Sequence, residues 1–148
     1  MQLLVSADGS GVVRDSVLPA IVALADGVSP EVTVLHVVHA ASEAWSDEEL
    51  TQVMADRREN IEQLVRDASF PVEVLIEALP YGGTIDYYIA HRATDLDVDA
   101  IVVCSKRSTG IVGGLLGSIA QGLLEHSPVP VIVVRPDGDD DDEPDAKS

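Results

Sequence analysis

A glycine-rich loop after a short apolar run could hold an anion such as a phosphate. The run Ile101–Cys104 has the length of one buried strand, and the residues from Gly117-Ser118 onward show the apolar spacing of a helix. Between them, glycine recurs at Gly110, Gly113 and Gly114. Glycine lets the backbone approach an anion closely, and the first N–H groups of a helix point toward it. The loop therefore predicts a phosphate cradle, although its spacing is neither G-x-G-x-x-G nor G-x-x-x-x-G-K-[ST].

The other chemically reactive side chains are interpreted as structural or solvated. Cys104 ends an apolar strand and is typical of a small core residue rather than a reactive thiol. Ser118 has no nucleophile elbow and no Ser/His/Asp arrangement, so it is interpreted as a helix cap or a phosphate ligand. Asp8 is the one candidate for a general base, and His36 and His39 point to opposite faces of their strand. We therefore predict no catalytic residue and no metal site.

Strands and helices alternate along the chain, which predicts right-handed βαβ units and a parallel sheet. The predicted strands are Gln2–Ala7, Glu31–Val38, Val72–Leu79, Ile101–Cys104 and Val131–Val134. Helices are expected between them: one with Val13, Val17, Ile21, Leu24 and Ala25 on its inner face, starting or bending at Pro19; one from a capping box at Ser46 and Glu49 to Ala68; one after Thr84; and one after Gly117. In such sheets ligands bind beyond the carboxyl ends of the strands, so the glycine-rich loop would lie at the expected edge.

The composition describes an acidic single-domain protein. The chain has 148 residues, of which 46% are hydrophobic, and 26 acidic against 9 basic residues give a formal charge of -17. This bias disfavours nucleic acid as a partner. One cysteine allows no internal disulfide, and the start of the sequence lacks the basic region of a signal peptide. No apolar run has the length of a membrane span, so we expect a cytoplasmic protein with a domain at 1–136 and a disordered acidic tail at 137–148.

The acidic bias with few lysines is typical of proteins from a high-salt cytoplasm, where screening weakens repulsion between carboxylates. The alternative is a mildly acidic domain carrying an acidic tail. For a high-salt protein, the melting temperature should rise as KCl increases from low to molar concentration. Truncation after Pro136 should keep the fold and reduce this effect only in part. A melting temperature that stays flat or falls with salt would contradict the high-salt interpretation.

Three segments resemble the universal stress protein family, in its order and spacing. They are the opening LLVSADGS, the second-strand VTVLHVV, and the closing STGIVGGLLGSIAQGLLEHSPVPVIVVRP. With the acidic bias, the resemblance suggests a halophilic archaeal source. It also implies a flavodoxin-like or Rossmann-like five-stranded sheet in the order 3-2-1-4-5 with helices on both faces. It further implies a homodimer, which we expect to form through the edge strand Val129–Val134.

One branch of that family binds ATP, so the resemblance implies a possible site for ATP, with Mg²⁺ if it binds. The positions that correspond to its nucleotide contacts are Ala7, Asp8, Val37, Val103, Cys104, Arg107, Gly117, Ser118 and Ile119. The loop of the nucleotide-binding branch resembles G-x2-G-x9-G-[ST], but here Cys104 and Arg107 stand where its first two glycines belong. Arg107 could bind phosphate itself or fill the empty pocket. We therefore expect a regulatory stress-response module with an adenine-nucleotide site. The alternatives are an interaction protein without nucleotide, and a slow nucleotide hydrolase.

Overall fold

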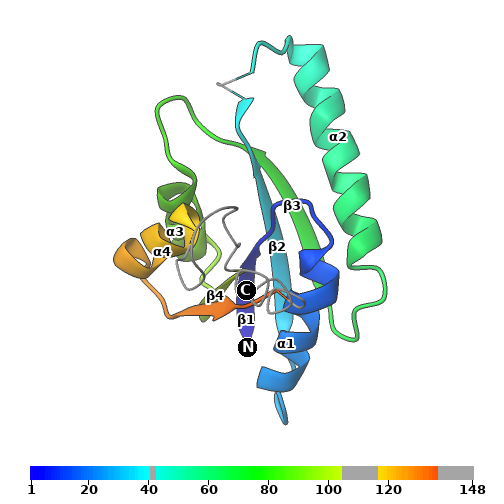
Figure 1. Ribbon diagram of the computed structural model, residues 1–148, viewed down its shortest axis with the longest axis vertical. Coiled ribbons are helices and arrows are strands. Elements are labelled where there is room, and N and C mark those ends of the chain that lie inside the picture. Colours follow the sequence, from blue (N-terminus) through cyan, green and yellow to red (C-terminus); the bar gives the residue numbers. More distant parts are fainter. Residues whose placement is uncertain (41–42, 105–116, 137–148) are drawn as a thin grey trace, which may run out of the picture.

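A computed structural model of the chain describes residues 1–40, 43–104 and 117–136 and contains a parallel sheet between two layers of helices (Figure 1). The strands are β1 (Gln2–Ser6), β2 (Glu31–Val38), β3 (Val72–Ala78), β4 (Ala100–Cys104) and β5 (Val131–Val134). Their order is β3-β2-β1-β4-β5, and every pairing is parallel, which confirms the predicted architecture. The order reverses between β1 and β4, which places the switch point of the sheet there.

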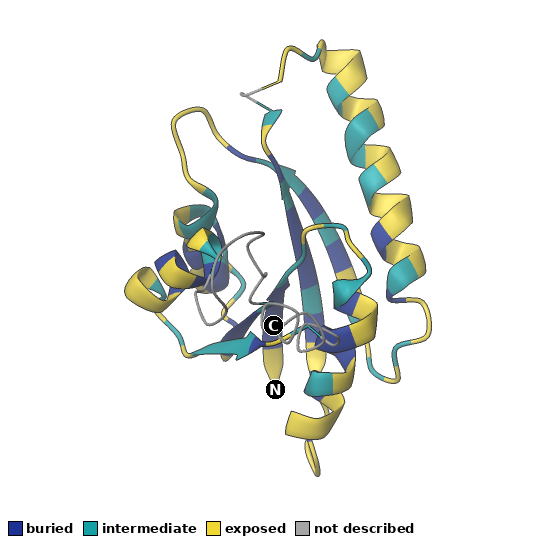
Figure 2. Cartoon of the chain, viewed as in Figure 1, coloured by how far each residue is buried: buried dark blue, intermediate teal, exposed yellow. Residues whose placement is uncertain are grey.

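Helices cover both faces of the sheet. A π-helical segment η1 (Val13–Val17), α1 (Leu18–Leu24) and α2 (Asp47–Leu64) lie on one face, and α3 (Ile85–Asp95) and α4 (Ser118–His126) lie on the other. The side chains of the central strands alternate between the two layers: Leu3 and Val5 pack toward α1 and α2, and Leu4 packs toward α3 and α4. Figure 2 shows the buried residues gathered along the sheet and on the helix surfaces that face it.

α1 starts at Leu18, next to Pro19, which confirms one of the two predicted alternatives, and a π-helical segment precedes it. The π-helical segment closes with the Leu18 N–H donating to the carbonyl of Val13. α1 then begins, and Pro19 lies in its first turn, where its missing N–H costs no helical hydrogen bond. The predicted inner face was wrong at Leu24, which is 56% exposed. Ala25, four residues after the buried Ile21, is buried as predicted.

The capping box predicted for the second helix is present at α2. Ser46 Oγ accepts from the Glu49 N–H at 3.1 Å, and Glu49 Oε1 accepts from the Ser46 N–H at 2.8 Å. The helix ends at Leu64 rather than Ala68. Thr84 is the N-cap of α3 as predicted, but its side chain makes no capping hydrogen bond. Within the described residues, no helix is long and apolar enough to cross a bilayer.

α3 and α4 approach each other closely at Gly122. A Cβ atom at this position would lie 2.8 Å from the Cβ of Asp86 on α3, closer than side chains pack. Ala120 and Leu123 on either side of Gly122 are buried with Ile89 and Ala93 of α3. The absent side chain at Gly122 thus allows α4 to dock against α3 and fixes where α4 begins relative to the sheet.

Candidate functional site

The carboxyl ends of β1, β2 and β4 lie next to one another at one edge of the sheet. Val5 of β1 pairs with Val34 on one side and Val102 on the other. The ladder continues past the end of β1, because the Ala7 N–H donates to the Leu35 carbonyl at 3.0 Å. Ala7 therefore extends β1 to the edge at which β2 and β4 also end. Ligands of open parallel sheets bind at this edge, beside the switch point.

The loop after β1 is a turn held by its own side chains. Asp8 is exposed, and its Oδ1 accepts from the Ser10 N–H at 2.9 Å. Ser10 Oγ in turn accepts from the Val12 N–H at 3.3 Å. Between them Gly9 has a φ of 90°, a conformation that glycine adopts far more readily than other residues. The turn therefore places the Asp8 carboxylate at the edge in a defined conformation.

The predicted contact residues Val37, Val103 and Cys104 lie at the carboxyl ends of β2 and β4 but differ in how far their side chains are buried and which helix layer they face. Val37 and Val103 both pack with the α3–α4 layer, and Val103 is only 4% exposed. A ligand would therefore meet the backbone of Val103 rather than its side chain. Cys104 is partly buried and packs with the α1–α2 layer, which agrees with the interpretation of a small core residue.

The start of α4 supplies the expected helix terminus beside β4. Gly117 is the N-cap, and its carbonyl accepts from the Gln121 N–H at 3.0 Å. Because glycine has no side chain, the cap residue itself offers no oxygen to the N–H groups of Ser118 and Ile119 in the first turn. Ala120, one residue further, is buried in the same apolar cluster as Val103, so packing against α3 holds this terminus on the same face of the sheet as Val103.

The rest of the glycine-rich loop lies outside the described residues. This applies to Arg107, Gly110, Gly113 and Gly114, and also to the acidic tail from 137 onward. The two models for Arg107, a phosphate ligand or a residue that fills the pocket, thus stay predictions from the sequence.

A partly buried polar network that could not be recognised from the sequence joins the Asp8 loop to β2 and α2. His36 is 5% exposed, its Nδ1 lies 2.9 Å from the Ala7 carbonyl oxygen, and its Nε2 lies 2.8 Å from Arg57 Nη1. A guanidinium can only donate, so Nε2 must be the acceptor and Nδ1–H donates to Ala7. Burial lowers the pKa of His36, and the Arg57 charge lowers it further, against the opposing effects of the Ala7 carbonyl and Asp8. The ring is therefore neutral at pH 7.

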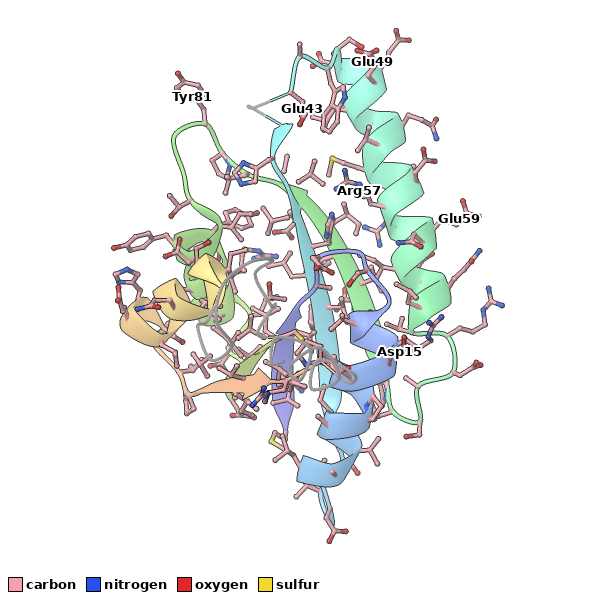
Figure 3. The ribbon with its side chains drawn as sticks, viewed as in Figure 1. Asp15, Glu43, Glu49, Arg57, Glu59 and Tyr81 are labelled. Carbon is pink, nitrogen blue, oxygen red and sulfur yellow. The ribbon has the colours of Figure 1, made fainter. Side chains whose placement is uncertain are left out.

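A second contact from α2 reaches the other side of Asp8. Asn60 Nδ2 donates to the Gly9 carbonyl at 2.9 Å, one helical turn away from Arg57. One feature of the sequence indicates that α2 makes a polar contact with the sheet. Arg57 occupies the position where the apolar stripe of Met54, Ile61 and Leu64 would continue. Figure 3 shows Arg57 on the side of α2 that faces the sheet and Glu59 on its outer side.

An ionic cluster beside Val37 fixes α3 to β3. Glu77, the partner of Val37 in the sheet register, accepts from Arg92 Nε at 2.8 Å, from Arg92 Nη2 at 2.9 Å and from the Tyr88 hydroxyl at 2.6 Å. Burial acts to raise the pKa of Glu77, but these hydrogen bonds outweigh it and hold the pKa below its ordinary value. Burial and the Glu77 carboxylate together raise the pKa of Tyr88 to about 12. Both carboxylate oxygens are occupied, so the cluster serves as a fixed wall of the edge.

Comparison with known proteins agrees with this architecture. The pattern of the universal stress protein family matches residues 1–135. Universal stress protein MJ0577 of Methanocaldococcus jannaschii is 30% identical over 87 residues, which cover 58% of this chain and 51% of that protein. The solved structure of MJ0577 aligns with a TM-score of 0.67 and 28% identity over 90% of this chain and 94% of that one.

More distant structures share the fold, and some of them hold nucleotides. The universal stress protein of Archaeoglobus fulgidus in complex with dAMP has a TM-score of 0.60 at 21% identity, and covers 90% of this chain and 97% of that one. A family member from Arabidopsis thaliana with AMP bound has a TM-score of 0.57 at 18% identity, and covers 94% of both chains. The family match over nearly the whole length, together with the shared sheet, shows that this chain belongs to the universal stress protein family.

Proposed function

We propose that this chain is a stress-response module that binds an adenine nucleotide, with ATP as the first candidate, at the carboxyl edge of its sheet. The observation that carries the proposal is the start of α4, capped by Gly117, on the face of the sheet that Val103 of β4 also faces, together with the switch point between β1 and β4. Structures of relatives with dAMP and AMP support an adenine nucleotide as the ligand class.

The described residues fit such a ligand. Phosphates would lie against the N–H groups of Ser118 and Ile119, where the helix dipole favours negative charge. The adenine base would lie near Val37, which is partly buried among apolar side chains near the carboxyl end of β2. Asp8 at the adjacent edge could contact the ribose or hold Mg²⁺ through oxygen ligands. Each part of the nucleotide thus meets groups of suitable chemistry.

Calorimetric titration of ATP with Mg²⁺ at high salt tests the proposal, and Arg107→Gly separates the two models for the loop. Where Arg107 is a phosphate ligand, its loss should weaken binding by about 1.5–3 kcal/mol, the range for hydrogen bonds to charged groups. Where Arg107 fills the pocket, the same substitution should create or strengthen binding, because glycine restores the close backbone approach. Absence of detectable binding to either protein would contradict the proposed nucleotide site.

We also propose that the protein acts as a homodimer in a high-salt cytoplasm. β5 is an edge strand whose Val131, Ile132 and Val133 are only partly buried in the single chain. Such an apolar edge favours pairing with a second copy. The formal charge of -17 supports the high-salt setting.

A further inference from the structure

We propose that His36, Arg57 and Asn60 form a clamp that positions Asp8 at the edge of the sheet, and that protonation of His36 opens this clamp on one side by expelling Arg57. For its effect on ligand binding the inference rests on the proposed nucleotide site. The clamp itself is a property of the chain alone.

The clamp holds the two peptide carbonyls that flank Asp8. The carbonyl of Ala7, on the amino side, accepts from His36 Nδ1–H at 2.9 Å. The carbonyl of Gly9, on the carboxyl side, accepts from Asn60 Nδ2 at 2.9 Å. Asp8 lies between two fixed carbonyl groups, so its backbone has few accessible conformations. Binding of a ligand then costs little further conformational entropy at Asp8. β2 and α2 thus hold the loop through these two hydrogen bonds, in addition to the turn contacts of Asp8 and Ser10.

Arg57 determines which nitrogen of the His36 ring carries the hydrogen. Arg57 Nη1 donates to Nε2 at 2.8 Å, so Nε2 stays unprotonated and Nδ1 carries the hydrogen that holds Ala7. Protonation at Nε2 would bring one N–H against another and two positive charges into direct contact. Arg57 then has to leave the ring. Nδ1–H still donates to Ala7, but α2 no longer supports the ring and keeps only its Asn60 contact with the loop.

Among the residues that the structure describes, the charges of Arg57 and Asp8 act on the ring. Arg57 comes from α2 and opposes protonation, whereas Asp8 comes from the loop after β1 and favours it. On β3 the partner of His36 is the apolar Ile76. Arg14 and Asp15 of η1 pair with each other at 2.7 Å on the surface. Protonated His36 would therefore lose Arg57 and draw the Asp8 carboxylate toward itself, away from the site.

The protein without nucleotide provides the first test. We expect the amide signals of Gly9 and Ser10 in ¹H–¹⁵N spectra to move together with the ring signals of His36 as the pH falls from about 7.5 to about 5. His36→Asn retains a side-chain N–H donor for Ala7 but has no titrating ring, so the same amides should not move in that variant over this range. Amide signals that stay constant while His36 titrates, or a His36 that stays neutral throughout, would overturn the proposed opening of the clamp by protonation.

Nucleotide affinity provides the second test, with AMP as the probe. Protonation should raise the apparent Kd by about threefold to tenfold at acid pH, because only the closed fraction of the protein is competent. The phosphate of AMP itself titrates near pH 6, and the His36→Asn protein gives that background. Asn60→Ala should weaken AMP binding at both neutral and acid pH. Glu59→Ala, on the outer side of α2, should leave the affinity for AMP unchanged at both.

Failure of the clamp inference and failure of the proposed nucleotide site would give different results. A pH dependence of affinity that is equal in the natural protein and in His36→Asn would overturn the inference while leaving the nucleotide site intact. Absence of AMP binding at every pH would contradict the proposed function, and the amide titration would still decide whether the clamp exists.

Discussion

Replacing Ile61 by alanine is expected to lower the free energy of unfolding by about 2–5 kcal/mol, the usual range for removing a large aliphatic side chain from a core. Ile61 is 0% exposed and is the one buried residue among the 18 of α2. It packs in the cluster that includes Val34 and Val74, so its loss leaves a cavity between α2 and the sheet. Urea unfolding at fixed high salt measures the change.

Glu59→Ala is the matched control, since Glu59 lies two residues away on the exposed side of the helix (Figure 3). It should change stability by no more than about 0.5 kcal/mol. A loss below about 1 kcal/mol for Ile61→Ala would mean that burial is not what attaches α2. The hydrogen bonds from Arg57, Arg58 and Asn60 would then hold the helix, because Arg58 Nη1 also donates to the Val74 carbonyl at 2.7 Å.

Placing an aspartate at Val133 is expected to convert the protein from a dimer to a monomer. Val133 lies on the edge strand β5 and is partly buried within the single chain. Pairing of β5 with a second copy would bury it further, and an unpaired carboxylate in that interface is costly. Light scattering at high salt should report twice the chain mass for the natural protein and close to the chain mass for Val133→Asp.

Val28→Asp is the matched control, because Val28 is 51% exposed in the turn before β2. This variant should stay dimeric, and circular dichroism should show that both variants keep their helices. A monomer mass for the natural protein would contradict the proposed interface. So would a Val133→Asp protein that stays dimeric.

The sheet could be predicted from the sequence because strong local patterns agreed with the global fold. Apolar runs of strand length alternated with helical periods, and the capping box at Ser46 set the start of α2 within one residue. The inner face of the first helix was predicted correctly except at Leu24. Leu24 is 56% exposed at the end of α1, although Ile21, three residues earlier in the same helix, is buried.

The site was predicted less completely, for a physical reason. Asp8, Val37 and Gly117 could be placed because parallel strands bring their carboxyl ends to one edge. The clamp beneath Asp8 depends on contacts between residues far apart in the sequence, such as Ala7 with His36 and Gly9 with Asn60. Local patterns do not carry such contacts. The only local sign of these contacts in the sequence is Arg57, a polar residue within the apolar stripe of α2.

The most direct test of the nucleotide site is a map of amide shifts in ¹H–¹⁵N spectra as AMP is added at high salt. We predict that the largest changes fall on Asp8, Val37, Ser118 and Ile119, at the carboxyl edge. Residues at the opposite edge, such as Val28 and Phe70, should not change. Shifts centred on that opposite edge, or none at saturating AMP and ATP, would contradict the account.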